Sequence, residues 1–343
     1  MKDSLGNKIP KTAVILRHTE VGGFRSCPRK WYLESHNGLN LEPVVKNRKL
    51  SEGICWHAGL ESHYNGEGFT VGFDKAFSEE VEALVEATGE SLSTNLALDM
   101  EEGFDPEACS ELQKEVLERA KLAYTLYEHY QDWAEAEATP SDSEFKVVFT
   151  ERRFVVPLMT NTGHRSRTWI AAKLDGVVSV GDTYYILEHK YVSKSTRVND
   201  PDHLALDLQM GIQILVLQEY LRANYPGKKV GGAIYNLTRK QLPGPRVKAP
   251  LFGRHLVYRT QKELAILADD LYRDSKLMRN TKKLSLPDVM HNPQPWGGIC
   301  TWGCAFRDVC ESVNKAEDYP YLLTFYKKRE KSIWDLLKEE MEE

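Results

Sequence analysis

The segment that most restricts the fold of this chain is a predicted β-hairpin over residues 170–194, IAAKLDGVVSVGDTYYILEHKYVSK. Two apolar runs, rich in β-branched and aromatic residues, flank Gly181 and Asp182. A two-residue loop between such runs is typical of a hairpin, and its length sets which residues face each other. The predicted register places Asp175 directly opposite Glu188.

This register gathers charged side chains. Lys173 faces Lys190, and strand alternation places Glu188 and Lys190 on one face and His189 on the other. Directly paired residues have Cβ atoms about 4.5–5.5 Å apart, so Asp175 and Glu188 would repel each other unless a cation lay between them. Their oxygens suit Mg²⁺ or Mn²⁺, and a Lys two residues after the Glu can orient a hydroxide or neutralise a scissile phosphate. The alternative is a surface hairpin with solvated charges, but apolar strands rarely carry charges without a reason.

Amino-acid composition restricts the class of protein and the cell compartment in which this hairpin occurs. The 343 residues are 28% charged and 41% hydrophobic, which is ordinary for a globular protein. No segment approaches the roughly 20 apolar residues of a membrane-spanning helix, and the amino terminus resembles no signal peptide. We therefore expect a cytosolic protein without a membrane partner, whose six cysteines are not a disulfide framework.

The net charge of −5 argues weakly against a nucleic-acid partner. Residues 239–259, however, carry six Arg or Lys and no Asp or Glu, and such a basic stretch could hold a phosphate backbone.

Hydrophobic periodicity predicts a mixed α/β fold with a small central sheet flanked by helices. Apolar residues at helical spacing predict helices over 19–36, 49–64, 74–90, 106–138, 200–223 and 260–280. Alternating segments predict strands over 144–158, 230–237 and 256–258 in addition to the hairpin. Residues 139–143 interrupt both patterns and form the best internal boundary. We therefore divide the chain into a helical part (1–140), a core (141–285) and a cysteine-rich region with a final helix (286–343), which together form one compact domain.

Four motifs in this order resemble the PD-(D/E)XK nuclease superfamily, and most closely its RecB-like members, including CRISPR-associated exonucleases, the AddB nuclease domain and stand-alone phage versions. They are a His on an early helix (His57), an Asp on the first hairpin strand (Asp175), the Glu188-His189-Lys190 triple, and a Gln209-Met210-Gly211-Ile212-Gln213 helix segment. Ala172 replaces the family's usual Gly, and Gln213 replaces its usual Tyr.

The resemblance implies a restriction-endonuclease-like core and a metal bound by His57, Asp175, Glu188 and the backbone carbonyl of His189. By itself, His57 would also be consistent with a core histidine. Lys190, Asp175 and Glu188 would be catalytic. Candidate DNA contacts are Gln209, Gln213, Lys194 and Arg197, although the two glutamines could instead contact the active site.

A second group of residues consists of cysteines from the two ends of the chain. Cys300, Cys304 and Cys310 lie within eleven residues, and Cys27 is the natural fourth member of a tetrahedral site. Free thiols or a zinc site would also suit this spacing. The resembled family binds a [4Fe–4S] cluster in this arrangement, with one cysteine before the nuclease core and three after it. We favour the cluster, which would join the ends of the domain.

We therefore expect a metal-dependent DNA nuclease, an exonuclease acting on single-stranded or free-ended DNA. The resemblance places such proteins in DNA repair and recombination, with recombination, replication or CRISPR-related proteins as partners. The alternative from another class is a non-catalytic DNA-binding or adaptor module of the same fold. The presence of Asp175, Glu188 and Lys190 together speaks against that alternative.

Overall fold

The computed structural model describes residues 1–343 except 11, 45–50, 89–110, 161–162, 194–201, 243, 245–246, 248–249, 295–297 and 343. Its centre is a six-stranded mixed sheet with β1, β4, β5, β6 and β7 in this order, while β3 pairs with β4. β1 and β4 run parallel, as do β5 and β6, and the other neighbours are antiparallel. The strands are β1 (Val14–Leu16), β3 (Lys146–Met159), β4 (Arg165–Val180), β5 (Thr183–Val192), β6 (Lys229–Arg239) and β7 (Phe252–Val257).

The predicted hairpin is present as β4 and β5. Its ladder runs from Val180↔Thr183 to Gly176↔Leu187, which is the predicted register. Gly181 has a φ of +58°, a backbone conformation that favours glycine and suits the first position of a two-residue loop. The ladder ends one residue before Asp175. Beyond this point β4 and β5 are no longer paired with each other, while β5 remains paired with β6 and β4 with β3.

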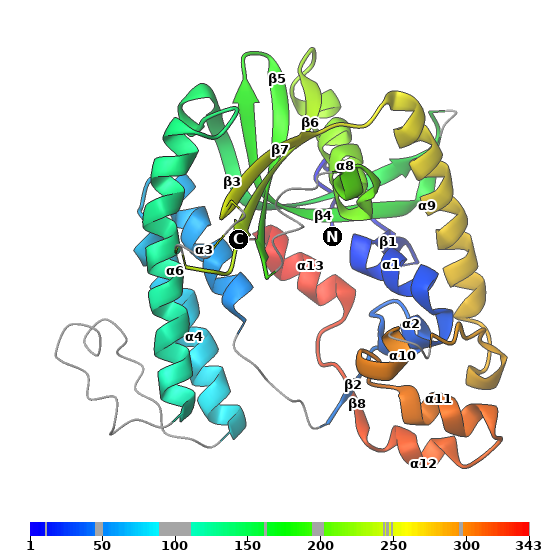
Figure 1. Cartoon of the computed structure of the whole chain (residues 1–343). Coiled ribbons are helices and arrows are strands. Elements are labelled where there is room, and N and C mark those ends of the chain that lie inside the picture. The colour runs from blue at the N-terminus through cyan, green and yellow to red at the C-terminus, as the bar shows by residue number, and fades with distance from the viewer. Residues whose placement is uncertain are drawn as a thin grey trace.

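Helices cover both faces of the sheet. On one face, α8 contacts β3, β4 and β6, and α9 contacts β1, β3 and β4, with α1 packed against both helices. On the other face, α3 contacts β3, β4 and β5 and leads into the long pair α4 and α6 (Figure 1). The helices of this layer arrangement are α1 (His18–Ser26), α8 (Leu208–Asn224), α9 (Gln261–Thr281), α3 (Glu52–Tyr64), α4 (Phe69–Thr88) and α6 (Glu111–Ala136).

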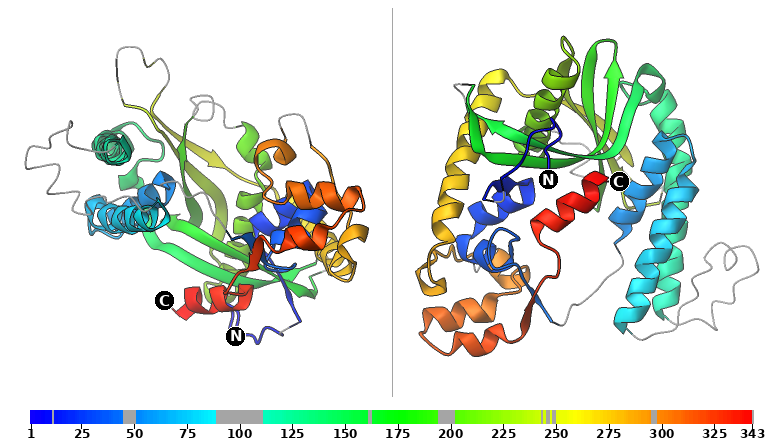
Figure 2. Two further views of the ribbon diagram at one scale, coloured as in Figure 1. Left: turned by 90° about the horizontal axis from the view of Figure 1, so that it is seen from below. Right: turned by 180° about the vertical axis from the view of Figure 1, so that it is seen from behind.

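The carboxy-terminal region packs against the amino-terminal helices. In Figure 2, the three short helices before the final one lie near α2 (Pro28–Glu34), at the end of the molecule remote from α4 and α6, whereas the final helix packs against β3. A two-stranded antiparallel sheet joins β2 to β8 in the same area. The elements concerned are α10 (Ile299–Trp302), α11 (Arg307–Asn314), α12 (Tyr319–Leu323), α13 (Ile333–Glu342), β2 (Leu41–Pro43) and β8 (Tyr326–Lys328). The two ends of the chain therefore meet, and β1 from the predicted helical part belongs to the central sheet.

One predicted helix is divided into two. The expected single helix over 19–36 is broken at Cys27, which has an extended backbone (φ −157°, ψ 107°). Pro28 causes the break, because a residue before proline is pushed out of the helical region and proline donates no backbone hydrogen bond. Cys27 is thereby placed at the junction of α1 and α2 instead of within a helix.

Two helix starts have polar caps. Thr260 and Glu263 form a capping box at the start of α9. Asp207 caps α8 by accepting a hydrogen bond from the backbone N–H of Gln209, so this helix begins at Leu208 and the preceding residues Asp202–Leu206 form a short 3₁₀ helix, η2. No helix in the described part of the chain has the length and apolar character needed to cross a membrane.

Candidate active site and cysteine cavity

Helix α3 presents His57 to a cleft beside the sheet. Trp56 and Leu60 are buried in the core that α3 forms with α4 and α6. Ile54, by contrast, is 55% exposed and lines the cleft together with His57, so this side of α3 faces the cleft and not the apolar core. The cleft has a volume of about 550 Å³ and is lined by residues from α3, β3, β4 and β5, among them His57, Glu61, Glu151, Lys173, Asp175 and Lys190.

Asp175 lies where β4 and β5 separate. Its Oδ2 accepts a hydrogen bond from the backbone N–H of His189 at 2.9 Å and lies 3.3 Å from Nδ1 of His57. Burial raises the pKa of Asp175, but the bond to His57 and its charge outweigh burial and lower the pKa to about 2. In the same way, burial lowers the pKa of His57, and Asp175 raises it by more. The two groups therefore form an ion pair at the edge of the cleft.

Glu188 is buried and faces helix α8. Its oxygens accept hydrogen bonds from Lys190 Nζ at 2.5 Å, Gln209 Nε2 at 2.5 Å and Gln213 Nε2 at 2.7 Å. Burial first, and then the charge of Asp175, raise the pKa of Glu188 to about 7 in spite of Lys190. The predicted grouping of Glu188 with Lys190 is therefore present, and His189 points elsewhere, as strand alternation requires.

Two details of the predicted register need correction. Asp175 does not pair with Glu188, and Lys173 does not pair with Lys190, because the β4–β5 ladder ends at Gly176. Each carboxylate has its own hydrogen-bond donors, although the charge of Asp175 still raises the pKa of Glu188. Lys173 forms an ion pair with Glu151.

The two glutamines of α8 hold Glu188 instead of facing outward. Gln213 is 1% exposed and is therefore too deeply buried to contact a DNA strand. Gln209 is partly exposed and also accepts a hydrogen bond from Lys190 at 2.9 Å. Of the two interpretations open for this pair, the geometry supports a role in the active site. The predicted DNA contacts Lys194 and Arg197 lie outside the described residues.

Glu151 is a site residue that the sequence pattern did not reveal. It lies on β3 between Thr150 and Arg152, whose partners on β4 are Gly176 and Leu174, so it stands opposite Asp175. Its φ of +45° is unusual for a residue inside a strand. An acidic residue within a strand rich in Val and Phe could have indicated a functional site. The register of β3 against β4 was needed to place Glu151 beside Asp175.

Three of these residues can hold a metal ion. Nδ1 or Nε2 of His57 and carboxylate oxygens of Glu151 and Asp175 all lie within 4.8 Å of one another. Carboxylate oxygens and an imidazole nitrogen fit Mg²⁺ or Mn²⁺. The predicted ligand Glu188 is on the adjacent strand, with its carboxylate turned toward Lys190 and α8. The donor set in the cleft thus fits a divalent cation.

A buried polar network holds α3 against the sheet. Tyr64, at the end of α3, bonds to Tyr130 on α6 at 2.7 Å and to Asp142 at 3.0 Å. Arg254 binds Asp142 at 2.7 Å and Asn236 at 2.6 Å, and Asn236 donates to Tyr130 at 3.0 Å. The network fixes the position of His57 relative to Asp175. It also shows that Arg254, in the predicted basic stretch 239–259, is a buried structural residue that no phosphate can reach.

Metal binding at this site should release protons in a pH-dependent way. At pH 6, the raised pKa values of Glu188, about 7, and of His57 leave both groups largely protonated, and a cation must displace those protons. We expect Mn²⁺ titration calorimetry, in two buffers of different ionisation enthalpy, to show proton release at pH 6 that falls toward pH 8. The affinity should rise about tenfold per pH unit for each proton released. Glu188→Gln should remove about one proton from the release, and a release that is the same at both pH values would contradict the assignment.

Removing the charge of Glu151 should weaken metal binding. Glu151→Gln keeps the size of the side chain but removes a charged oxygen from the group of three. We expect Mn²⁺ affinity, measured by calorimetry, to fall at least tenfold. Glu128→Gln, an exposed change on α6, is the matched control and should bind Mn²⁺ like the wild type. Equal affinity for Glu151→Gln and wild type would exclude Glu151 from the ligand set.

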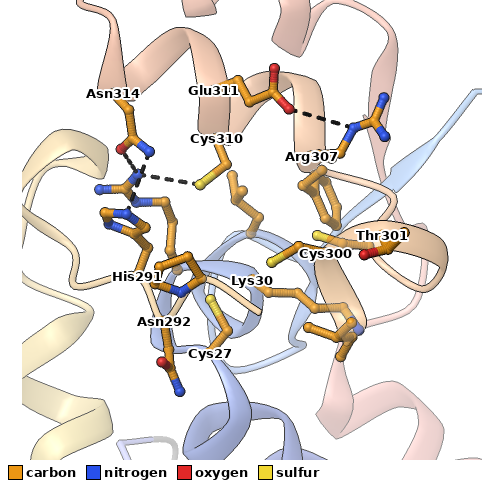
Figure 3. A pocket seen from close by; sticks show the side chains of 16 residues that line it. Cys27, Lys30, His291, Asn292, Cys300, Thr301, Arg307, Cys310, Glu311 and Asn314 are labelled. Atoms are coloured by element: carbon orange, nitrogen blue, oxygen red, sulfur yellow. Dashed lines mark hydrogen bonds and ion pairs between the residues drawn. The ribbon is translucent and has the colours of Figure 1, made fainter. Parts of the chain in front are cut away.

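The four predicted cluster cysteines line one cavity. It has a volume of about 380 Å³, and Cys27, Cys300, Cys304 and Cys310 all contribute to its wall. Figure 3 shows the sulfurs of Cys27, Cys300 and Cys310 directed toward this common space. Burial above all raises the pKa of the Cys304 thiol, and the closeness of Cys300 and Cys27 adds to this effect. Residues 27 and 310 are thus brought together from the two ends of the chain.

The thiols are free and available as ligands. No disulfide joins the five cysteines that the structure describes. Cys300 Sγ accepts a hydrogen bond from the backbone N–H of Gln294 at 3.3 Å, and Cys310 Sγ accepts one from Arg29 at 3.4 Å. Four sulfurs around a cavity fit either a [4Fe–4S] cluster or a single zinc ion. The remaining described cysteine, Cys55, is buried on α3 in another core.

The fold and the site residues together define a class of enzyme. A mixed sheet carries an Asp and a Glu-x-Lys triple on adjacent strands, beside a helix with a His, and these groups border a cleft with a donor set for a divalent cation. This arrangement of side chains is typical of a metal-dependent phosphodiester hydrolase. The family model of the PD-(D/E)XK nuclease superfamily matches residues 17–311, and the chain belongs to that superfamily of phosphodiester-hydrolysing nucleases, which use divalent metals such as Mg²⁺ or Mn²⁺. A search of curated proteins finds no match.

Proposed function

We propose that this protein is a DNA exonuclease of the RecB-like type, which hydrolyses single-stranded or free-ended DNA and carries a [4Fe–4S] cluster. The observation that carries the nuclease assignment is the cleft in which His57, Glu151 and Asp175 converge, with Lys190 on its wall. The superfamily supplies the reaction, and the cysteine cavity supports the RecB-like subtype.

The metal would be held by His57 and Asp175 with Glu151, and Glu188 and the backbone carbonyl of His189 complete the set that the resemblance implies. When bound, a divalent cation polarises a phosphate oxygen and lowers the pKa of a bound water. Asp175 is already ionised through its pairing with His57, so it is ready to act as a ligand.

Lys190 has the most direct catalytic role of the residues in this chain. Burial lowers its pKa, but the adjacent Glu188 raises it by more, so the ammonium stays charged. Glu188 and Gln209 fix Nζ, and Lys190 also lines the cleft. From there it can orient the attacking water and stabilise the negative charge that develops on the phosphate. The two glutamines keep this pair in position.

The cluster would be bound by Cys27, Cys300, Cys304 and Cys310. It would join α2 to α10 and α11 and thereby close the chain around the sheet. Its role in this proposal is structural. Recombination, replication or CRISPR-related protein partners and a cytosolic location stay predictions from the resemblance.

Paired substrates test the exonuclease proposal. The wild-type chain is incubated with Mg²⁺ or Mn²⁺ and either linear or circular single-stranded DNA of the same sequence, with end-labelled linear duplex as a third substrate. The proposal predicts degradation of linear single strands and survival of the circle. Degradation of the circle at the rate of the linear strand would show an endonuclease, and no cleavage of any substrate would favour a DNA-binding module.

A further inference from the structure

Arg29 is a buried cation that pairs with no carboxylate among the residues that the structure describes. It lies on α2, two residues after Cys27, and is 4% exposed. Its Nε donates to the carbonyl oxygen of Val289 at 3.0 Å, and Nη2 to that of Pro287 at 3.4 Å. Nη1 donates to Asn314 Oδ1 at 2.7 Å and to Cys310 Sγ at 3.4 Å. Within the described chain, no Asp or Glu forms an ion pair with Arg29.

A buried guanidinium requires a negative charge nearby. Arginine does not lose its proton in proteins, so burial cannot be relieved by neutralisation. An isolated buried charge is costly unless it is paired. Three of the four acceptors around Arg29 are neutral oxygens. The fourth acceptor is Cys310 Sγ in the cavity wall, so a negatively charged group bound to this sulfur would supply the missing partner.

The other charged residues of the cavity already have partners. Glu311 lies 3.6 Å from Arg307, at the outer side of α11. Lys30 lies 3.5 Å from Glu34, one turn along α2. Arg29 differs from these ion-paired residues by its deeper burial and by its contact with a sulfur.

We propose that Arg29 is the counter-ion of the sulfur-bound group in this cavity: its buried charge and its hydrogen bond to Cys310 Sγ raise the reduction potential of the cluster. This inference rests on the proposed cluster. Four thiolates make an iron–sulfur cluster net negative, and one added electron makes it more so. A fixed positive charge and a hydrogen bond to a ligand sulfur stabilise the reduced form, and such interactions are known to set cluster potentials.

The same contacts give Arg29 a positioning role. Its guanidinium bridges α2, which follows Cys27, to the segment 287–289 and to α11, which carries Cys310. It therefore orients Cys310 relative to Cys27. A lysine at this position would keep the charge but could not form the same fork of hydrogen bonds.

The test compares wild type, Arg29→Met, Arg29→Lys and the control Arg273→Met, each as the full chain purified without oxygen. Arg273 is 69% exposed on α9 and pairs with Asp270, away from the cavity. The readouts are iron per chain, visible absorbance, circular dichroism for folding, and the midpoint potential in a dithionite titration, in which the cluster takes up one electron.

We expect Arg29→Met to disfavour reduction about tenfold, which lowers the midpoint by about 59 mV for a one-electron couple. Arg29→Lys should lie nearer to the wild type, and Arg273→Met should match it. If Arg29→Met folds but holds no iron, iron content in Arg29→Lys decides the question. Retention of iron by Arg29→Lys supports the role of the positive charge, and loss of iron from both variants contradicts it. Iron-loaded Arg29→Met at the wild-type potential overturns the inference and leaves the cluster standing. A wild-type chain that contains no iron overturns both.

Discussion

Replacing Lys190 by alanine is expected to lower the rate of DNA cleavage about a hundredfold to a thousandfold, the usual effect of removing one charged group that stabilises a transition state. The ammonium is held at 2.5 Å from Glu188 and 2.9 Å from Gln209, whereas Lys173, which also lines the cleft, is paired with Glu151. The rate should be measured on end-labelled single-stranded DNA at saturating Mg²⁺, with metal affinity determined separately.

The control for this prediction is Lys262→Ala, an exposed change at the start of α9. It removes the same charge from the chain and should leave the rate unchanged. Arginine at position 190 should rescue little, because its planar group cannot occupy the compact site between Glu188 and Gln209. If Lys190→Ala cleaved as fast as the wild type, Lys190 would have no part in catalysis.

The second large effect is expected from the cysteines. Cys304→Ser should remove one cluster ligand and abolish most of the bound iron and the visible absorbance. Because the cluster would close a loop from Cys27 to Cys310, nearly the whole chain, its loss should cost stability. Because loop-closure entropy grows only slowly with loop length, a cross-link over so long a loop is worth about 5 kcal/mol, and we expect the midpoint of thermal unfolding to fall by about 10 °C.

Cys55→Ala is the matched control for Cys304→Ser. Cys55 is equally a free cysteine, but it lies on α3 outside the cavity. It should keep the iron content of the wild type. A brown preparation whose absorbance survives Cys304→Ser would exclude Cys304 as a ligand, and a colourless wild type with one bound zinc would show that the four thiols form a zinc site.

Local sequence signals predicted those parts of the fold that short-range physics decides. The Gly181-Asp182 loop set the β4–β5 register, and Thr260 with Glu263 set the start of α9. The superfamily was predicted from motifs in order, and the family match over residues 17–311 confirms it. Cys27 was placed with the later cysteines although most of the chain lies between them.

The remaining features depended on long-range geometry. Glu151 joins the site through the β3–β4 register and an unusual backbone angle, and neither follows from its neighbours in sequence. The separation of β4 from β5 at Gly176 decides that Asp175 turns to His189 while Glu188 turns to α8. The sequence alone left open whether His57 is a core histidine, and packing decides this point: α3 buries Trp56 and Leu60 against α4 and α6 and leaves His57 at the cleft.

The most direct test of the central claim is metal-dependent cleavage by the wild-type chain and by Asp175→Asn. Both proteins are stripped of metal, supplied with Mg²⁺, Mn²⁺ or a chelator, and incubated with end-labelled linear single-stranded DNA. The account predicts that the wild type cleaves with either metal and stops with the chelator, while Asp175→Asn, folded by circular dichroism, fails to cleave in all conditions. Cleavage by Asp175→Asn at the wild-type rate, or cleavage by the wild type in the presence of the chelator, would contradict it.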